Sequence, residues 1–289
     1  LERFSAPTRA WFEGAFEGPT AAQEGAWTAI AAGQDALVVA PTGSGKTLSA
    51  FLWSLDRLAS SPAPQDKARR CRVLYVSPLK ALAVDVERNL RGPLAGIRQA
   101  AQRLGMPEPD IRVAMRSGDT PPQERRAFTR TPPDILITTP ESLFLLLTSA
   151  AREVLRGVDT VIVDEVHAVA ATKRGAHLAL SLERLDALLD QPAQRIGLSA
   201  TVRPLEEVAR FLGGSREVTV VQPPTAKTIE VSVQVPLEDL GELGDQERQS
   251  IWPAVEERVV GLVEAHRSTI VFTNSRRTAE RLTSRLNEI

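Results

Sequence analysis

The 289-residue sequence contains a single cysteine, Cys71. A disulfide within the chain and a cysteine-ligated iron–sulfur cluster are therefore both excluded. The three histidines, His167, His177 and His266, do not have the spacing of a zinc site. A reducing compartment, the cytoplasm, fits such a chain best.

Long hydrophobic runs and an excess of one charge are also missing. No apolar run approaches the roughly 20 residues that cross a bilayer, and the first residues show no signal-peptide pattern, so we expect no membrane partner. The formal net charge is −1, which argues against a polybasic binder. It does not exclude an enzyme that holds nucleic acid with a few side chains and helix ends. The first residue is Leu1, which suggests a segment of a longer chain.

Short apolar or β-branched runs recur through the first 200 residues, each followed by a helical or polar segment. Fully apolar short runs that alternate with helices predict an α/β fold, in which helices cover both faces of a parallel sheet. The predicted strands are Ala36–Ala40, Val73–Ser77, Ile111–Met115, Ile135–Thr139, Thr160–Asp164 and Arg195–Ser199.

Two helices have recognisable ends. Thr120, followed by Pro121, Pro122 and Gln123, predicts a capping box with proline in the first turn. The segment after Pro204 predicts a helix that ends before the glycine pair 213–214.

The pattern changes after about Gly214. The segment 250–289 predicts the first α/β unit of a second domain, which is left unfinished. We therefore assign 1–215 to a first domain, 216–249 to connecting strands and a linker, and 250–289 to the start of the second. The predicted elements are strands Glu217–Val221, Ile229–Val235 and Thr269–Thr273, an acidic linker Glu238–Arg248, and helices Val255–Ala265 and Ser275–Leu286.

A glycine-rich loop follows the first predicted strand. Its glycines let backbone N–H groups approach a phosphate chain, and the following helix N-terminus favours negative charge. The first position of the usual pattern is Ala40 instead of glycine, a mild change because the later glycines make the close approach. Lys46 would reach the β/γ-phosphates and Thr47 would ligate Mg²⁺; the alternative is a chance glycine turn. The remaining loop residues expected at the nucleotide are Thr42, Gly43, Ser44 and Gly45.

An acid pair ends another buried strand. Adjacent carboxylates at a strand end are costly unless a cation or ligand is near. Asp164 would hold Mg²⁺ through water and Glu165 would act as the general base; the alternative is a solvated acidic turn. His167 is either a relay to the second domain or a satisfied polar residue. Ser199 and Thr201, after a later strand, would report the state of the acid pair.

Polar residues also gather at other strand-to-helix junctions. Exposed helix N-termini with hydroxyl groups are suited to nucleic-acid phosphates, although ordinary helix capping explains each one taken alone. The candidates for strand binding are Pro78, Lys80, Arg116, Gly118, Thr139 and Pro140.

Taken in order, the segments APTGSGKT, SPLKAL, TTPES, DEVH and SAT resemble superfamily 2 helicases over nearly all of residues 1–215. The resemblance implies RecA-like domains, ATP and Mg²⁺. It implies that Gln23, in the segment PTAAQ, reads the adenine edge, with Phe16 or Trp27 packing on the base. It further implies that Asn274 and Arg276, in IVFTNSR, contact nucleic acid.

Within the superfamily the sequence most resembles the bacterial large helicase-related (Lhr) group, through SPLKALAVDVERNL, DEVHAVAATKRGAHLALSLERL and FTNSRRTAERL. This implies 3′-to-5′ translocation on single-stranded DNA, unwinding of DNA or RNA–DNA duplexes, and a role in DNA repair. The family completes its ATP site with arginines from late motifs of the second RecA-like domain, and the sequence stops at Ile289 before them. We therefore expect the 289 residues to need the remainder of that domain and the C-terminal domains.

Other functions fit parts of the pattern. One alternative is a nucleotide-gated nucleic-acid-binding module without unwinding, and another is a Ski2-like RNA helicase. A metabolite kinase on the same phosphate loop is disfavoured, because the DEVH and SAT segments belong to a motor and not to an acceptor pocket.

Overall fold

The computed structural model describes residues 1–41, 43–224, 230–235 and 251–289. The chain divides into two compact units, Leu1–Thr225 and Ala226–Ile289. Each unit is described by itself below.

The first unit is built on one seven-stranded sheet in the order β3-β4-β2-β5-β6-β1-β7. All of its strand pairs are parallel. The strands are β1 (Asp35–Val39), β2 (Val73–Val76), β3 (Val113–Arg116), β4 (Ile135–Thr138), β5 (Thr160–Val163), β6 (Gln194–Ser199) and β7 (Val218–Val221). The predicted α/β class and the six predicted strands are confirmed. The strand predicted at Glu217–Val221 is also confirmed, and as β7 it joins this sheet beside β1.

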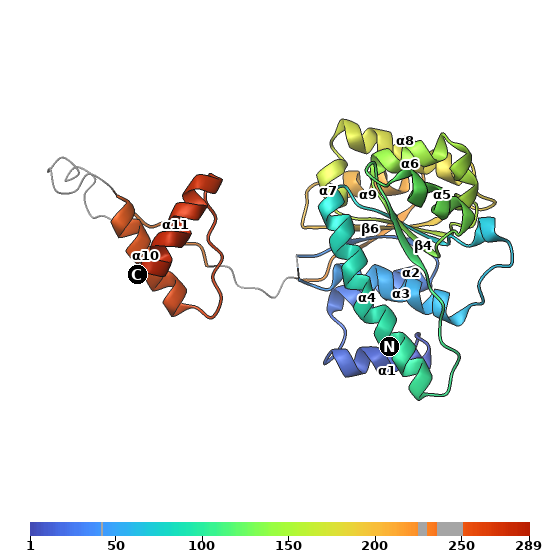
Figure 1. The fold of residues 1–289 in the computed structure, drawn as a ribbon, viewed down its shortest axis with the longest axis horizontal. Coiled ribbons are helices and arrows are strands. Elements are labelled where there is room, and N and C mark those ends of the chain that lie inside the picture. The colour runs from blue at the N-terminus through green and yellow to red at the C-terminus, as the bar shows by residue number, and fades with distance from the viewer. Residues whose placement is uncertain (42, 225–229, 236–250) are drawn as a thin grey trace. The chain divides into compact units, whose positions relative to one another are not determined.

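Helices cover both faces of the sheet (Figure 1). Successive strand residues therefore enter different cores: Ala36 and Val38 lie in one, Leu37 and Val39 in the other. This two-sided burial explains why the strands read as unbroken apolar runs. One face carries α1 (Ala6–Ala15), α2 (Ala21–Ala31), α3 (Lys46–Ser60) and α4 (Lys80–Arg103). The other carries α5 (Pro122–Arg130), α6 (Pro140–Leu147), α7 (Val166–Val169), α8 (Lys173–Asp186) and α9 (Leu205–Gly213). Two 3₁₀ helices, η1 (Lys67–Arg69) and η2 (Ala150–Leu155), lie in the connections.

The predicted helix ends have opposite outcomes. Helix α9 begins after Pro204, as predicted, and ends at Gly213, one residue into the predicted glycine pair; Gly214 follows with φ 65°. The capping box at Thr120 is wrong. Helix α5 begins at Pro122 with Pro121 as its N-cap residue and has no side-chain cap. The Thr120 hydroxyl instead accepts a hydrogen bond from the Ser117 amide at 2.9 Å, because it closes the preceding turn.

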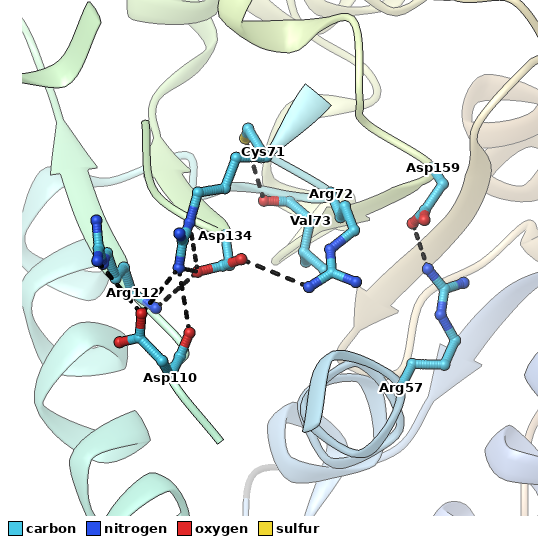
Figure 2. Close-up of polar contacts among 9 residues, drawn as sticks. Arg57, Cys71, Arg72, Val73, Asp110, Arg112, Asp134 and Asp159 are labelled. Atoms are coloured by element: carbon cyan, nitrogen blue, oxygen red, sulfur yellow. Dashed lines mark hydrogen bonds and ion pairs between the residues drawn. The ribbon is translucent and has the colours of Figure 1, made fainter. Parts of the chain in front are cut away.

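The amino-terminal edge of the sheet is held by ion pairs. Asp134, just before β4, is 1% exposed. Its carboxylate accepts hydrogen bonds from Arg70 at 3.0 Å and from the Arg112 amide at 2.9 Å, and it pairs with Arg72 at 3.5 Å (Figure 2). One buried carboxylate thus joins the segments that enter β2, β3 and β4. The adjacent Cys71 thiol is free and buried, and burial raises its pKa to about 12.

A second ion-pair network lies at the same edge, under β1 and β6. The Asp35 carboxylate accepts from the Arg195 amide at 2.6 Å and pairs with Arg216 at 3.2 Å. The Arg195 guanidinium is 2% exposed and pairs with Asp186 at 2.6 Å and Glu183 at 2.9 Å. These contacts join strands β1 and β6 to helix α8.

The second unit contains α10 (Trp252–Ala265) and α11 (Arg276–Glu288), which confirms the two predicted helices. The strand predicted at Thr269–Thr273 is wrong. Ile270 and Phe272 are 79% and 89% exposed, and the described residues of this unit offer no strand with which the segment could pair. Residues 230–235 of the strand predicted at Ile229–Val235 are likewise not a strand, and position 229 lies outside the described residues. The predicted linker Glu238–Arg248 also lies outside them. No described helix is long and apolar enough to cross a membrane.

Candidate functional site

The glycine-rich loop connects β1 to α3 at the carboxyl edge of the sheet. Gly43 and Gly45 have φ values of 81° and 80°, a region that only glycine enters without strain. Gly45 is the N-cap residue of α3 and has no side-chain cap, so the first amides of this helix are left for a ligand. Position 42, predicted to contact the nucleotide, lies outside the described residues.

Lys46 lies under this loop. Its side chain is 8% exposed, and Nζ donates a hydrogen bond to the Ala40 carbonyl at 2.7 Å. An ammonium has three donors, and this is its single hydrogen bond with the described residues. The Ser44 hydroxyl is also buried and has no partner among the described residues. An anion held by the loop would satisfy both groups.

The segment before α2 supports the loop from the side. Thr20 and Gln23 form a capping box, in which the Gln23 side-chain oxygen accepts from the Thr20 amide at 2.9 Å. The Thr20 hydroxyl donates to the Ser44 carbonyl at 2.9 Å. Gln23 is 4% exposed, and a Cβ on Gly45 would lie 2.5 Å from its Nε2. The structure therefore brings Gln23 against the phosphate loop. Gly45 is needed there both for its positive φ and because a side chain at this position would collide with Gln23.

A hollow of about 710 Å³ opens beside the loop and is lined by Phe16, Gln23, Lys46, Thr47 and Glu165, among others. Of the two aromatic candidates, Phe16 lines this hollow and is 43% exposed. Trp27 is buried, and its indole N–H donates to the Ser49 carbonyl at 2.9 Å, so it belongs to the core.

Trp11 is a further aromatic lining residue that sequence reasoning missed. A Cβ on Gly96 of α4 would collide with its ring. The sequence shows an aromatic residue in the segment that forms α1 and a glycine in the segment that forms α4. It does not show that these two residues are in contact.

The acid pair follows β5. Asp164 is 7% exposed, and its Oδ1 accepts from the Glu165 amide at 2.9 Å. Burial raises the pKa of Asp164, and the charge of Glu165 raises it further; Tyr75 and Lys46 act in the opposite direction. The Tyr75 hydroxyl faces this carboxylate but has no hydrogen bond of ordinary geometry with the described residues. Glu165 has φ 44°, a left-handed conformation unusual for a residue with a side chain.

The residues around the acid pair fit a magnesium ion. Mg²⁺ prefers oxygen ligands and is usually bound by one or two protein groups together with water and phosphate. The Asp164 carboxylate and the Thr47 hydroxyl are such groups. The described residues contain no cluster of three or more histidine, cysteine or acidic side chains that could enclose a metal. A cation shared with a bound phosphate chain agrees with this sparse ligand set.

His167 connects the acid pair to the end of β6. Its Nδ1 accepts a hydrogen bond from the Ala200 amide at 3.2 Å and lies 3.3 Å from both Ser199 Oγ and Glu165 Oε2. A backbone amide only donates, so Nδ1 is the acceptor in the contact with Ala200. Thr201 is exposed and makes no hydrogen bond with the described residues, so the structure brings Ser199, and not Thr201, to this cluster.

A second hollow, of about 300 Å³, lies at the same edge between the starts of α4 and α6. Helix α4 begins after Leu79 without a side-chain cap. Thr139 caps α6 by accepting from the Ser142 amide at 3.4 Å, so ordinary capping describes its hydroxyl. The Lys80 ammonium pairs with Asp119. The lining residues include Pro78, Lys80, Gly118 and Thr139 of the predicted strand-binding set, with Pro140 directly after Thr139; Arg116 lies in a neighbouring hollow.

The remaining predicted contacts lie in the second unit. Asn274 and Arg276 are exposed and flank Ser275, whose hydroxyl caps α11 by accepting from the Thr278 amide at 3.1 Å. Arg276 makes no ion pair with the described residues. Their predicted role in nucleic-acid contact stays a prediction.

The parallel sheet, the phosphate loop and the acid pair at its carboxyl edge define a RecA-like nucleotide-binding fold. Two structures of the DEAD-box helicase Mss116, at 18% identity with TM-scores of 0.55 and 0.61, share this fold. The model of the DEAD/DEAH box helicase family matches residues 20–210. The chain belongs to this family.

Among its relatives, the Lhr helicase/probable uracil glycosylase of Mycolicibacterium smegmatis is 70% identical over the whole chain, and the Lhr helicase/uracil glycosylase of Escherichia coli is 56% identical over 99% of it. The chain spans only 19–20% of the length of these two proteins. It also resembles the structure of the Mycobacterium smegmatis helicase Lhr bound to ssDNA and AMP-PNP, with a TM-score of 0.84 and 69% identity over 99% of this chain and 36% of that one. The predicted resemblance to the Lhr group is confirmed.

Proposed function

We propose that the chain is part of an ATP-dependent helicase that translocates 3′-to-5′ on single-stranded DNA and unwinds DNA or RNA–DNA duplexes in DNA repair. The proposal is supported by the Mycobacterium smegmatis helicase Lhr, whose structure is bound to ssDNA and AMP-PNP. The buried free Cys71 is consistent with a reducing, cytoplasmic setting. The proposed units are a first RecA-like domain at 1–215, a connection at 216–249 and the start of a second such domain at 250–289.

One observation carries the proposal: the nucleotide site and the strand site are built from loops at the same edge of the sheet. Arg174, on α8, donates to the Pro78 carbonyl at 2.9 Å and to Glu141 at 2.6 Å. Pro78 and Glu141 line the hollow between α4 and α6. Arg174 therefore joins both loops of the proposed strand site to α8, the second helix after the acid pair.

At the nucleotide, we assign Lys46 and the loop amides to the β/γ-phosphates of ATP, and Phe16 with Gln23 to the base. Thr47 and, through water, Asp164 would hold Mg²⁺, which neutralises phosphate charge when bound. Glu165 would take a proton from the attacking water. His167, whose Nδ1 is committed to Ala200, would keep its Nε2–H for a partner, and Ser199 would sense its position.

At the strand, the uncapped start of α4 at Lys80 and the first turn of α6 after Thr139 would donate amides to phosphates. Pro78, Gly118 and Pro140 would shape this path, and Arg116 would extend it. Asn274 and Arg276 would add contacts from the second unit.

The test compares Lys46→Ala with Glu165→Gln. We expect Lys46→Ala to lose nucleotide binding in the 289-residue chain, because the ammonium supplies the charge for the phosphates. We expect Glu165→Gln to bind nucleotide normally and, in a protein extended to the length of the relatives, to lose strand-stimulated ATP turnover by about 10²-fold or more. Turnover that survives both changes would overturn the site. ATP turnover without strand separation in a duplex-unwinding assay would favour a nucleotide-gated binding module instead.

A further inference from the structure

A third hollow, of about 510 Å³, lies beside the edge strand β3, under helix α5 and the start of η2. Four arginines and two hydroxyl residues supply its polar lining, and no acidic residue lines it. We call it the arginine hollow, defined by Arg116, Arg125, Arg126 and Arg130.

The guanidinium groups of the arginine hollow have no carboxylate partner among the described residues. Arg116 lies 5.3 Å from the centroid of the Phe128 ring, and its Nη1 is buried without a hydrogen bond. Burial and the charge of Arg125 lower the pKa of Arg116. Arg125 donates only to two carbonyls, those of Thr120 and Gly118, each at 2.7 Å. Arg126 and Arg130 are exposed and unpaired within the described residues.

For Arg116 and Arg125, which are half-buried, this lack of a carboxylate partner is uncommon among the described residues. Most other buried or half-buried arginines of the first unit, such as Arg70, Arg72 and Arg195, face carboxylates. The whole chain has 36 acidic and 35 basic residues, so carboxylates are not scarce. Like charges gathered in a hollow repel one another and are costly unless an anion joins them. The position of the arginine hollow indicates which anion.

The arginine hollow adjoins the proposed strand site. Arg125 donates to the carbonyl of Gly118, and Gly118 lines the hollow between α4 and α6. The loop from Ser117 to Thr120 thus separates the two hollows, and Arg116 stands at its start. A strand that leaves the helix N-termini at α4 and α6 meets the arginines next.

We propose that the arginine hollow binds backbone phosphates of the nucleic acid, beyond the contacts made by the starts of α4 and α6. This inference rests on the proposed function. Guanidinium groups match phosphate oxygens in geometry and charge, and contacts of this kind position a strand without reading its sequence. The hollow would therefore lengthen the footprint and add affinity equally on any sequence.

The test uses the double variant Arg126→Ala/Arg130→Ala, whose side chains are exposed and hold no other part of the fold. The matched control is Arg98→Ala/Arg103→Ala, two exposed arginines on α4 that also have no ion pair within the described residues. Binding of a fluorescein-labelled single-stranded oligonucleotide to the 289-residue chain is measured by anisotropy over a series of salt concentrations. Thermal unfolding checks that each variant is folded.

We expect the double variant to bind about tenfold more weakly and the control to stay within about twofold of the unchanged chain. The slope of log affinity against log salt should fall by about 1.4 in the double variant, since each phosphate contact on a single strand contributes about 0.7. The loss should be the same on a homopolymer and on a mixed sequence.

Equal affinity and salt slope in the double variant and the unchanged chain would overturn the inference but leave the proposed function standing. An equal loss in the control would overturn it as well, because general charge and not the hollow would be responsible. Millimolar inorganic phosphate could also abolish the difference in affinity between the double variant and the unchanged chain. If that difference is in addition independent of oligonucleotide length, the hollow binds a free anion and the inference is overturned. Failure of the unchanged chain to bind any oligonucleotide would overturn the inference for these residues. The same assay on a protein extended to the length of the relatives would then decide the proposed function separately.

Discussion

The two edges of the central sheet both carry buried carboxylates, but these carboxylates have different partners. At the amino edge, the buried carboxylates Asp134 and Asp35 each pair with at least one arginine side chain and accept a backbone amide. At the carboxyl edge, Asp164 is equally buried but has no arginine or lysine within 4.0 Å among the described residues, and the adjacent Glu165 is in a left-handed conformation.

This difference separates stability from function. A buried carboxylate that is paired within the chain holds segments together, as Asp134 does for the segments entering β2, β3 and β4 (Figure 2). A buried carboxylate without a basic side chain beside it, such as Asp164, destabilises the unliganded chain and is tolerated where a ligand completes it. Substitutions at the two edges should therefore change different quantities.

The largest effect is expected at the amino edge. Asp134→Ala leaves Arg70 and Arg72 without their carboxylate and should lower the free energy of unfolding by about 3–5 kcal/mol, the usual cost of breaking a buried pair. Asp110→Ala is the matched control, because Asp110 pairs with Arg70 at 3.3 Å but is 69% exposed; it should cost less than about 1 kcal/mol. Urea denaturation measures both. Similar losses in the two variants would show that the buried carboxylate has no special role.

At the carboxyl edge, Asp164→Asn should weaken nucleotide binding only when Mg²⁺ is present. The amide keeps the shape of the carboxylate but removes the charge that attracts the cation. We expect at least a tenfold loss of affinity for Mg²⁺–ATP, about 1.4 kcal/mol, and little change for ATP with a chelator. Calorimetric titration under both conditions measures the ratio. A similar loss without Mg²⁺ would indicate that Asp164 contacts the nucleotide itself.

The third effect concerns the base. Phe16→Ala should lower affinity for ATP by about 1–2 kcal/mol, since a base stacked on an aromatic ring gains about that much. Affinity for inorganic triphosphate should not change, because the phosphate loop is untouched. Leu104→Ala, which removes another exposed apolar side chain, serves as the control. A parallel loss for both ligands would place Phe16 among residues that support the loop.

The sheet could be predicted from the sequence because each strand is recognisable from its own few residues. Strands such as β2 and β5 are short apolar runs between polar loops, and parallel pairing places the residues that follow them on one edge. Asp164 and the phosphate loop were found in this way. The same logic failed at Thr269–Thr273, where an equally apolar run has no strand partner among the described residues.

Contacts between residues far apart in the chain could not be predicted from the sequence in this way. Nothing in the sequence links Asp134 to Arg70, which lie 64 positions apart, or Trp11 to Gly96. Phe16 and Trp27 could not be ranked, because both are aromatic residues near Gln23 and only burial separates them. The capping box at Thr120 failed for a more local reason: two prolines follow it, and the turn before the helix uses the hydroxyl.

The smallest expected effect is the pH dependence of stability that comes from the buried Asp164 carboxylate. Burial raises the pKa of Asp164 above its ordinary value of 3.8, so the folded chain holds this proton more tightly than the unfolded chain. The ionised carboxylate therefore destabilises the fold above the raised pKa, and this cost disappears as pH falls below 3.8. Asp164→Asn avoids the cost, so without ligand it should be more stable than the unchanged chain at neutral pH. The gain should shrink as pH falls through the raised pKa, and saturating Mg²⁺–ATP should reverse it, because the ligand binds the unchanged chain more tightly than Asp164→Asn and so stabilises it more. Urea denaturation from pH 7 to pH 4 follows this difference. A gain that stays constant with pH would come from packing, and the contrast between the two edges would then not be electrostatic in origin.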